Sequence, residues 1–170
     1  MASQRCAAWV GVFLCGAVAL AGSAQQRRAS TPEERELALQ LIRQLETSPL
    51  SKSAPDSRQW LTFWLGQVSD VAPKTCDEML KPLEEEKREY AADVQAQVTF
   101  SSAGFILQNP AKARDDAAVL TAGLEGALRA YEAIARARPK AKSPFLDSLV
   151  TRRARAELPA YVREAMAKCQ

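Results

Sequence analysis

The sequence of 170 residues contains no histidine. Without an imidazole the chain cannot build a Ser-His-Asp triad, a cysteine–histidine pair, a histidine-ligated haem or the commonest zinc sites. The sequence also lacks a CxxC pair, a glycine-rich phosphate loop and a calcium loop of the DxDxDG type. We therefore expect no catalytic residue of these classes, no metal site and no cofactor.

Glycine is scarce too, with seven residues, and no segment alternates apolar and polar residues as a half-buried strand does. Several segments instead carry apolar residues at steps of three and four, which is the spacing of one face of a helix. The expected fold is all-α, an irregular helical bundle of five to seven helices.

The pattern predicts one long central helix over about 83–109, which ends at Asn109-Pro110 because a proline cannot continue a helix. A second helix is predicted over about 113–136. The two helices should form an antiparallel hairpin, with Val98 near Leu124 to within one helical turn.

Other helix starts carry capping residues. Thr31-Pro32 is followed by Glu34, three residues after the expected N-cap, and Ser143-Pro144 and Pro159 each place a proline where helices commonly begin. These signals predict helices that start at residues 32, 144 and 159.

The N-terminus has the three parts of a secretory signal peptide over residues 1–24: a positive charge, an apolar run and small residues before the cleavage point. Retention of the apolar run as a membrane anchor is the alternative. After cleavage we expect a flexible leader over 25–31, a single helical domain over 32–170 and no stable membrane insertion. The mature protein should be secreted, which means periplasmic in a Gram-negative bacterium and extracellular otherwise.

Signal cleavage would leave two cysteines, Cys76 and Cys169. An even number of cysteines in an oxidising compartment favours a disulfide between them. Two free thiols or a bridge between two molecules are the alternatives.

An aromatic ridge formed by Trp60, Phe63 and Trp64 is predicted on a helix near 57–71. Aromatic side chains are common in cores and in binding sites alike, so the ridge is either core or a surface that binds a partner.

A basic segment over residues 136–155 contains Arg152, Arg153 and Arg155 and is a candidate contact for an anionic surface. Phe145 is its only interleaved aromatic residue, so we do not expect nucleic-acid binding. The expected partner is another exported protein or a component of the cell envelope.

Four polar side chains in the second half of the long helix allow two interpretations. Gln97, Ser101, Ser102 and Gln108 either line a small polar pocket between the hairpin helices or reflect close helix packing with local hydrogen bonds.

The sequence therefore favours an exported binding or interaction domain without identifiable catalytic chemistry. The alternative is a hydrolase that uses a carboxylate pair, as glycoside-cleaving enzymes do, with Glu78, Asp93 and Glu125 as candidates. Such a pair would have to face one cleft.

Overall fold

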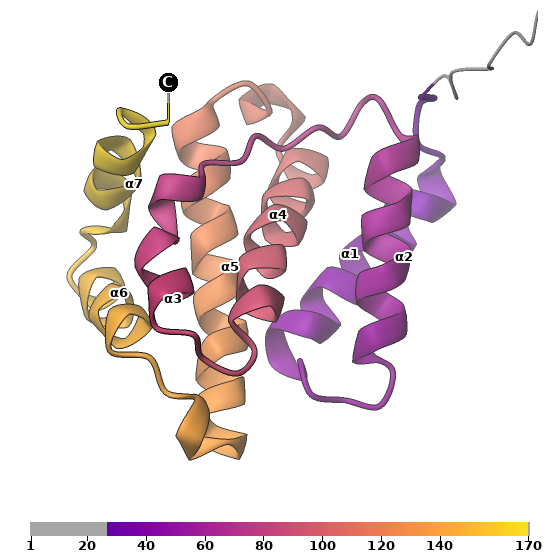
Figure 1. The fold of residues 1–170 in the computed structure, drawn as a ribbon. Helices are drawn as coiled ribbons and strands as arrows, with labels where there is room; N and C mark the ends of the chain where they lie inside the picture. Colours follow the sequence, from indigo (N-terminus) through magenta and orange to yellow (C-terminus); the bar gives the residue numbers. More distant parts are fainter. Residues whose placement is uncertain (1–26, 170) are drawn as a thin grey trace, which may run out of the picture.

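The computed structural model describes residues 27–169, and the predicted signal peptide lies outside this range. The described residues form seven α-helices and three short 3-10 helices and contain no β-strand, which confirms the all-α fold (Figure 1). The elements are α1 (Pro32–Thr47), α2 (Ala54–Gln67), η1 (Asp77–Met79), α3 (Lys81–Glu85), α4 (Ala91–Gln108), η2 (Pro110–Lys112), α5 (Asp116–Ala137), η3 (Pro139–Ala141), α6 (Pro144–Ala154) and α7 (Leu158–Met166).

Helices α4 and α5 form the central antiparallel hairpin, with α1 and α2 on one side and α3, α6 and α7 on the other (Figure 1). Gly123 of α5 lies against the carbonyl oxygen of Val98 in α4, one residue from the predicted Val98–Leu124 pair. The predicted hairpin and its register are confirmed.

The continuous helix predicted over 83–109 is wrong, because α3 ends at Glu85 and α4 begins at Ala91. Lys87 and Tyr90 adopt left-handed backbone conformations, with φ of 49° and 67°, which an α-helix cannot contain. A distant contact accompanies this break: the backbone N–H of Phe145, at the start of α6, donates to Glu86 Oε1 at 2.9 Å. The local sequence does not predict that contact, because Phe145 is distant in the chain.

Side-chain caps begin three of the helices. Thr31 and Glu34 form a reciprocal capping box at α1, and Asp115 accepts a hydrogen bond from Ala118 N at 3.0 Å at α5. Ser143 accepts one from Leu146 N at 3.0 Å at α6. The predicted helix starts are confirmed at α1 and α6, and α7 begins at Leu158, directly before Pro159.

Residues 27–31, expected as part of a flexible leader, are instead tied to the chain just after α2. Arg28 pairs with Val68 in a parallel β-bridge. The backbone N–H and the hydroxyl of Ser30 both donate to the Asp70 carboxylate at 2.8 Å. This segment therefore belongs to the folded domain.

An ion pair supports the same region. The Arg28 guanidinium hydrogen-bonds Glu34 and, together with the backbone N–H of Thr31, lowers the pKa of Glu34 to about 2. The indole N–H of Trp64 is buried without a partner of good hydrogen-bond geometry among the described residues, but it contributes to the lowered pKa of Glu34.

The core consists of two hydrophobic clusters that meet along α4. One cluster joins α1, α2 and the C-terminal half of α4 around Leu45 and Leu61. The other joins η1, α3, the N-terminal half of α4 and helices α5 to α7 around Leu124 and Leu149. In the part of the chain that the structure describes, no helix is both long and apolar enough to cross a membrane.

Candidate functional site

The aromatic ridge is mostly core. Trp64 is 2% exposed and stacks on the partly buried Trp60, with ring centroids 5.7 Å apart and planes 11° from parallel. Phe63 points away from the core and is 67% exposed. Because Trp64 is buried, Trp60 is partly buried and only Phe63 is fully exposed, the three rings do not form one exposed aromatic surface.

The basic segment is divided in a similar way. Arg153 forms an ion pair with Glu132 at 2.7 Å, and the Arg152 guanidinium lies over the Tyr161 ring, 5.5 Å from its centroid. Arg155 is exposed and has no ion pair among the described residues. Two of the three candidate arginines are thus engaged within the fold.

Glycines let α4 and α5 approach closely. A Cβ atom at Gly123 would lie 2.1 Å from Ser102 Oγ and 2.6 Å from the Val98 carbonyl oxygen. A Cβ atom at Gly126 would lie 2.0 Å from Ser101 Oγ. The serines therefore serve close helix packing, and Ser102 also donates to the Val119 carbonyl at 3.2 Å.

A buried polar chain extends from this contact toward α1. The Gln97 amide donates to Ser101 Oγ at 3.0 Å, and the Ser101 hydroxyl donates to Glu46 Oε1 at 2.7 Å. Arg129 donates to the other carboxylate oxygen of Glu46 at 2.9 Å. Both carboxylate oxygens of Glu46 are thereby satisfied, although its side chain is only 12% exposed.

Ser101 and Gln108 also line a hollow, so part of the pocket interpretation holds. This hollow has a volume of about 410 Å³ and lies between α1, α4 and α5. A second hollow of about 460 Å³ lies between α5, the end of α4 and α7. The two share Phe105, Ala122 and Glu125, and we call them together the α5 groove.

The candidate carboxylates Glu78, Asp93 and Glu125 do not meet. Glu78 pairs with Lys81 at 3.0 Å, and Asp93 pairs with Arg58 at 3.3 Å. Glu125 lies in the α5 groove, which Glu46 also lines, but Glu46 is held by Arg129 and Ser101. Residues 27–169 contain no group of three or more acidic or cysteine side chains able to hold a metal ion.

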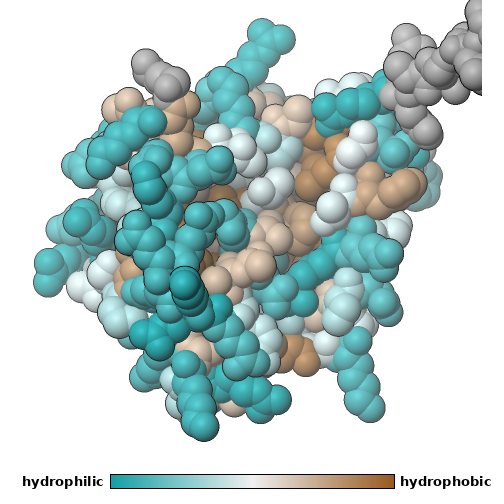
Figure 2. Space-filling model, in the orientation of Figure 1, coloured by the Kyte–Doolittle hydropathy of each residue, from teal (hydrophilic) through white to brown (hydrophobic). Residues whose placement is uncertain are grey.

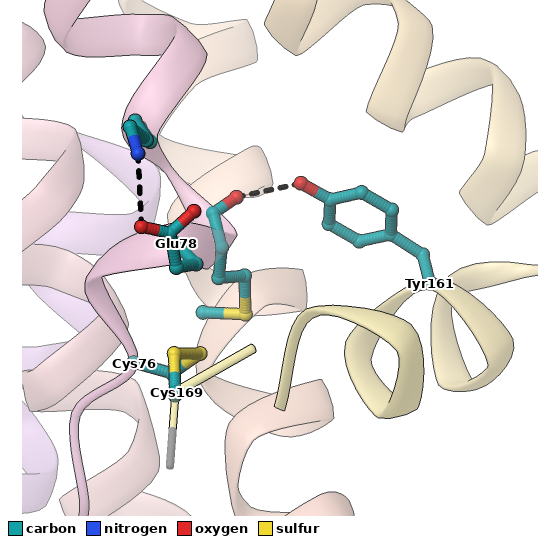
Figure 3. The surroundings of a disulfide bond; sticks show 6 residues. Cys76, Glu78, Tyr161 and Cys169 are labelled. Atoms are coloured by element: carbon teal, nitrogen blue, oxygen red, sulfur yellow. Dashed lines mark hydrogen bonds and ion pairs between the residues drawn. A yellow bond between two sulfur atoms is a disulfide. The ribbon is translucent and has the colours of Figure 1, made fainter. Parts of the chain in front are cut away.

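The predicted disulfide is present: Cys76 and Cys169 are bonded, with Cα atoms 5.6 Å apart (Figure 3). The bond attaches the end of α7 to the chain just before η1. Figure 3 also shows Tyr161 reaching from α7 to the same segment, where its hydroxyl donates to the Met79 carbonyl at 2.6 Å. Burial of Tyr161 raises its pKa.

A second polar cluster fastens α5 to α6. The Tyr131 hydroxyl donates to Asp147 Oδ1 at 2.6 Å and accepts from the Ser143 backbone N–H at 3.0 Å. Burial, reinforced by the Asp147 carboxylate, raises the pKa of Tyr131 to about 12. The phenol therefore stays protonated at neutral pH and acts as a structural donor.

A groove of about 350 Å³ lies beside the disulfide, between α4 and the segment 74–80. We call it the disulfide groove. Its apolar lining residues are Cys76, Met79, Leu80, Ala92, Ala96 and Val98, and its polar ones are Lys74, Thr75, Asp77, Gln95 and Thr99. Figure 2 shows this face of the molecule, with apolar surface gathered near its middle between hydrophilic side chains.

Of the residues that line the two grooves, only Ser101 and Gln108 were predicted from the sequence to line a pocket. The disulfide groove and the rest of the α5 groove were not predicted. The signal for them was a second set of small residues at helical spacing, Ala92 and Ala96 on α4 and Ala118 and Ala122 on α5, away from each helix's buried face. Short side chains there leave the hollows open. Comparison with models of known protein families, with curated proteins and with solved structures finds no match to this chain.

Proposed function

We propose that this protein is an exported helical binding domain that takes a small, mainly apolar ligand in the disulfide groove. The observation that carries the proposal is the groove itself. Its volume is about 350 Å³, its floor is apolar and a few polar groups lie on its rim. Small-molecule sites in proteins typically have this composition and a volume of about 300 to 1,000 Å³.

Bonds to other parts of the protein hold the walls of the disulfide groove in place, so the site is formed before a ligand binds. Cys76 is bonded to Cys169, Met79 accepts the Tyr161 hydrogen bond, and Lys74 pairs with Asp116 at the start of α5. A preformed site loses less conformational entropy when the ligand binds. The ligand's apolar body would lie against Ala96, with a polar end toward Gln95.

Export rests on the signal-peptide pattern of residues 1–24, and a disulfide is compatible with an oxidising compartment. The hydrolase alternative stays a prediction from the sequence. No observation favours it, because the candidate carboxylates are separated and two of them are paired with bases.

The neutral fluorescent probe N-phenyl-1-naphthylamine tests the proposed site. Its emission should rise saturably with the oxidised protein, and Ala96→Glu should weaken its affinity about tenfold, because a charge in an apolar site disfavours a neutral apolar ligand. Ala160→Glu places the same charge on an exposed position of α7 outside the groove and should leave the affinity unchanged.

Circular dichroism melting of both variants controls for folding. Absence of saturable binding, or equal affinity of the Ala96→Glu and Ala160→Glu variants, would exclude the disulfide groove as the ligand site.

A further inference from the structure

The α5 groove is a second open surface, independent of the disulfide groove. Its lining residues on α5 extend from Ala117 to Arg129, which corresponds to roughly 18 Å at the rise of an α-helix. An extended peptide of about five or six residues has this length.

The floor of the α5 groove is partly apolar. Phe105 and Ala122 line both hollows, Ala118 lies in one, and Leu39 lies on the α1 wall of the other. All four side chains are partly buried, so an occupant would cover them further. Apolar side chains are the complement of this floor.

Unpaired positive charges surround the floor. Lys112 and Arg163 line the hollow near α7, and Arg43 lines the hollow near α1. None of these three residues forms an ion pair with any described carboxylate. The fourth base, Arg129, is already paired with Glu46.

Two acidic groups belong to the same surface. Asp115 caps α5 and accepts the Ala118 N–H, whereas Glu125 lies at the junction of the two hollows without an ion pair among the described residues. The groups without an ion pair are therefore Lys112, Arg163 and Asp115 in the hollow near α7, Arg43 in the hollow near α1, and Glu125 where the hollows meet. The cations outnumber the carboxylates among them.

We propose that the α5 groove binds an extended peptide segment of another protein, with apolar residues at its centre and carboxylates toward both ends. The cations lie in two separate hollows, so they match charges spread along a chain better than one compact anion. Complementary rim charges mainly steer association and select the partner, while the apolar floor supplies buried area.

A displayed library of random hexapeptides, panned against the intact oxidised protein, tests this proposal. Selected peptides should be enriched in acidic residues on both sides of apolar ones. For the best labelled peptide, fluorescence anisotropy should give affinities about fivefold weaker for Arg43→Glu and for Arg163→Glu, since each reversal replaces an attraction with a repulsion.

Matched variants isolate the groove. Arg155→Glu makes the same charge change at an exposed arginine outside the groove, and it should alter the affinity less than about twofold. Glu125→Gln should strengthen binding, because it removes a groove carboxylate that repels the acidic peptide. If either arginine variant proves unstable, Lys112→Glu makes the same test at an exposed residue of η2.

Three outcomes overturn the proposal. One is selection of no peptides, or of peptides without acidic enrichment. Another is equal weakening by Arg155→Glu. The third is displacement of the peptide by heparin with no preference for apolar residues in the library, which would assign the surface to an anionic polymer. Binding of the naphthylamine probe does not depend on any of these results.

Discussion

At the scale of single residues, the α4–α5 contact depends on the absence of side chains. Gly123 faces the Val98 carbonyl oxygen, which belongs to the backbone and cannot turn away as a side chain could. The sequence indicated close packing here through Ser101 and Ser102, but not which partner residues complete it. Those partners depend on the hairpin register, which no local pattern fixes to one residue.

We expect Gly123→Ala to lower the free energy of unfolding by about 1 to 3 kcal/mol, because the new methyl group forces α4 and α5 apart. The measurement is urea unfolding followed by circular dichroism. Gly66→Ala is the control: a Cβ atom at Gly66 meets nothing within 4 Å, and alanine in a helix should stabilise by about 0.5 to 1 kcal/mol. Equal stability of the Gly123→Ala variant and the unsubstituted protein would contradict the close contact.

At the scale of helices, the capping residues could be recognised from the sequence, whereas the break between α3 and α4 could not. Thr31 and Ser143 act within three residues of their own positions, so a single sequence reveals them. Residues 84–89 contain no glycine or proline, and their charged side chains favour a helix. The helix ends there nonetheless, and Glu86 bonds a residue 59 positions away, a contact that only the folded chain provides.

The turn between α6 and α7 gives a related test. Ala156 has φ of 58°, a conformation that glycine adopts without steric cost, so Ala156→Gly should stabilise the protein by about 1 kcal/mol. Ala160→Gly, at an exposed position with helical backbone in α7, should instead destabilise it by about 0.5 to 1 kcal/mol. Thermal and urea unfolding of the two variants should thus move in opposite directions. A shift of both in the same direction would mean that backbone conformation does not decide the effect.

At the scale of the whole molecule, the all-α fold and the disulfide followed from composition and cysteine number, but the candidate sites did not. The proposed ridge divided into a buried Trp64 and an exposed Phe63, because α2 packs on α1 along only one side. Grooves arise where several helices leave a gap, and such gaps depend on how helices meet in space.

The disulfide should contribute strongly to stability. Its two cysteines are 93 residues apart, and loop-closure entropy gives a bond of this span a stabilisation of up to about 4 to 5 kcal/mol. We expect a protein with both Cys76→Ser and Cys169→Ser to unfold at lower urea concentration by a corresponding amount. Mass spectrometry after alkylation without a reductant should find both thiols unmodified in the unsubstituted protein. Alkylation of both would show that the bond is not formed.

The same bond makes residues 76–169 a closed covalent ring, from which the preceding part of the chain extends as a tail. One cut in the ring, for example at the exposed bend that contains Lys87, opens the circle without dividing the molecule. A protease that cuts inside the ring would therefore need a second cut there, or the help of a reductant, to release any piece of the segment from α3 to α7.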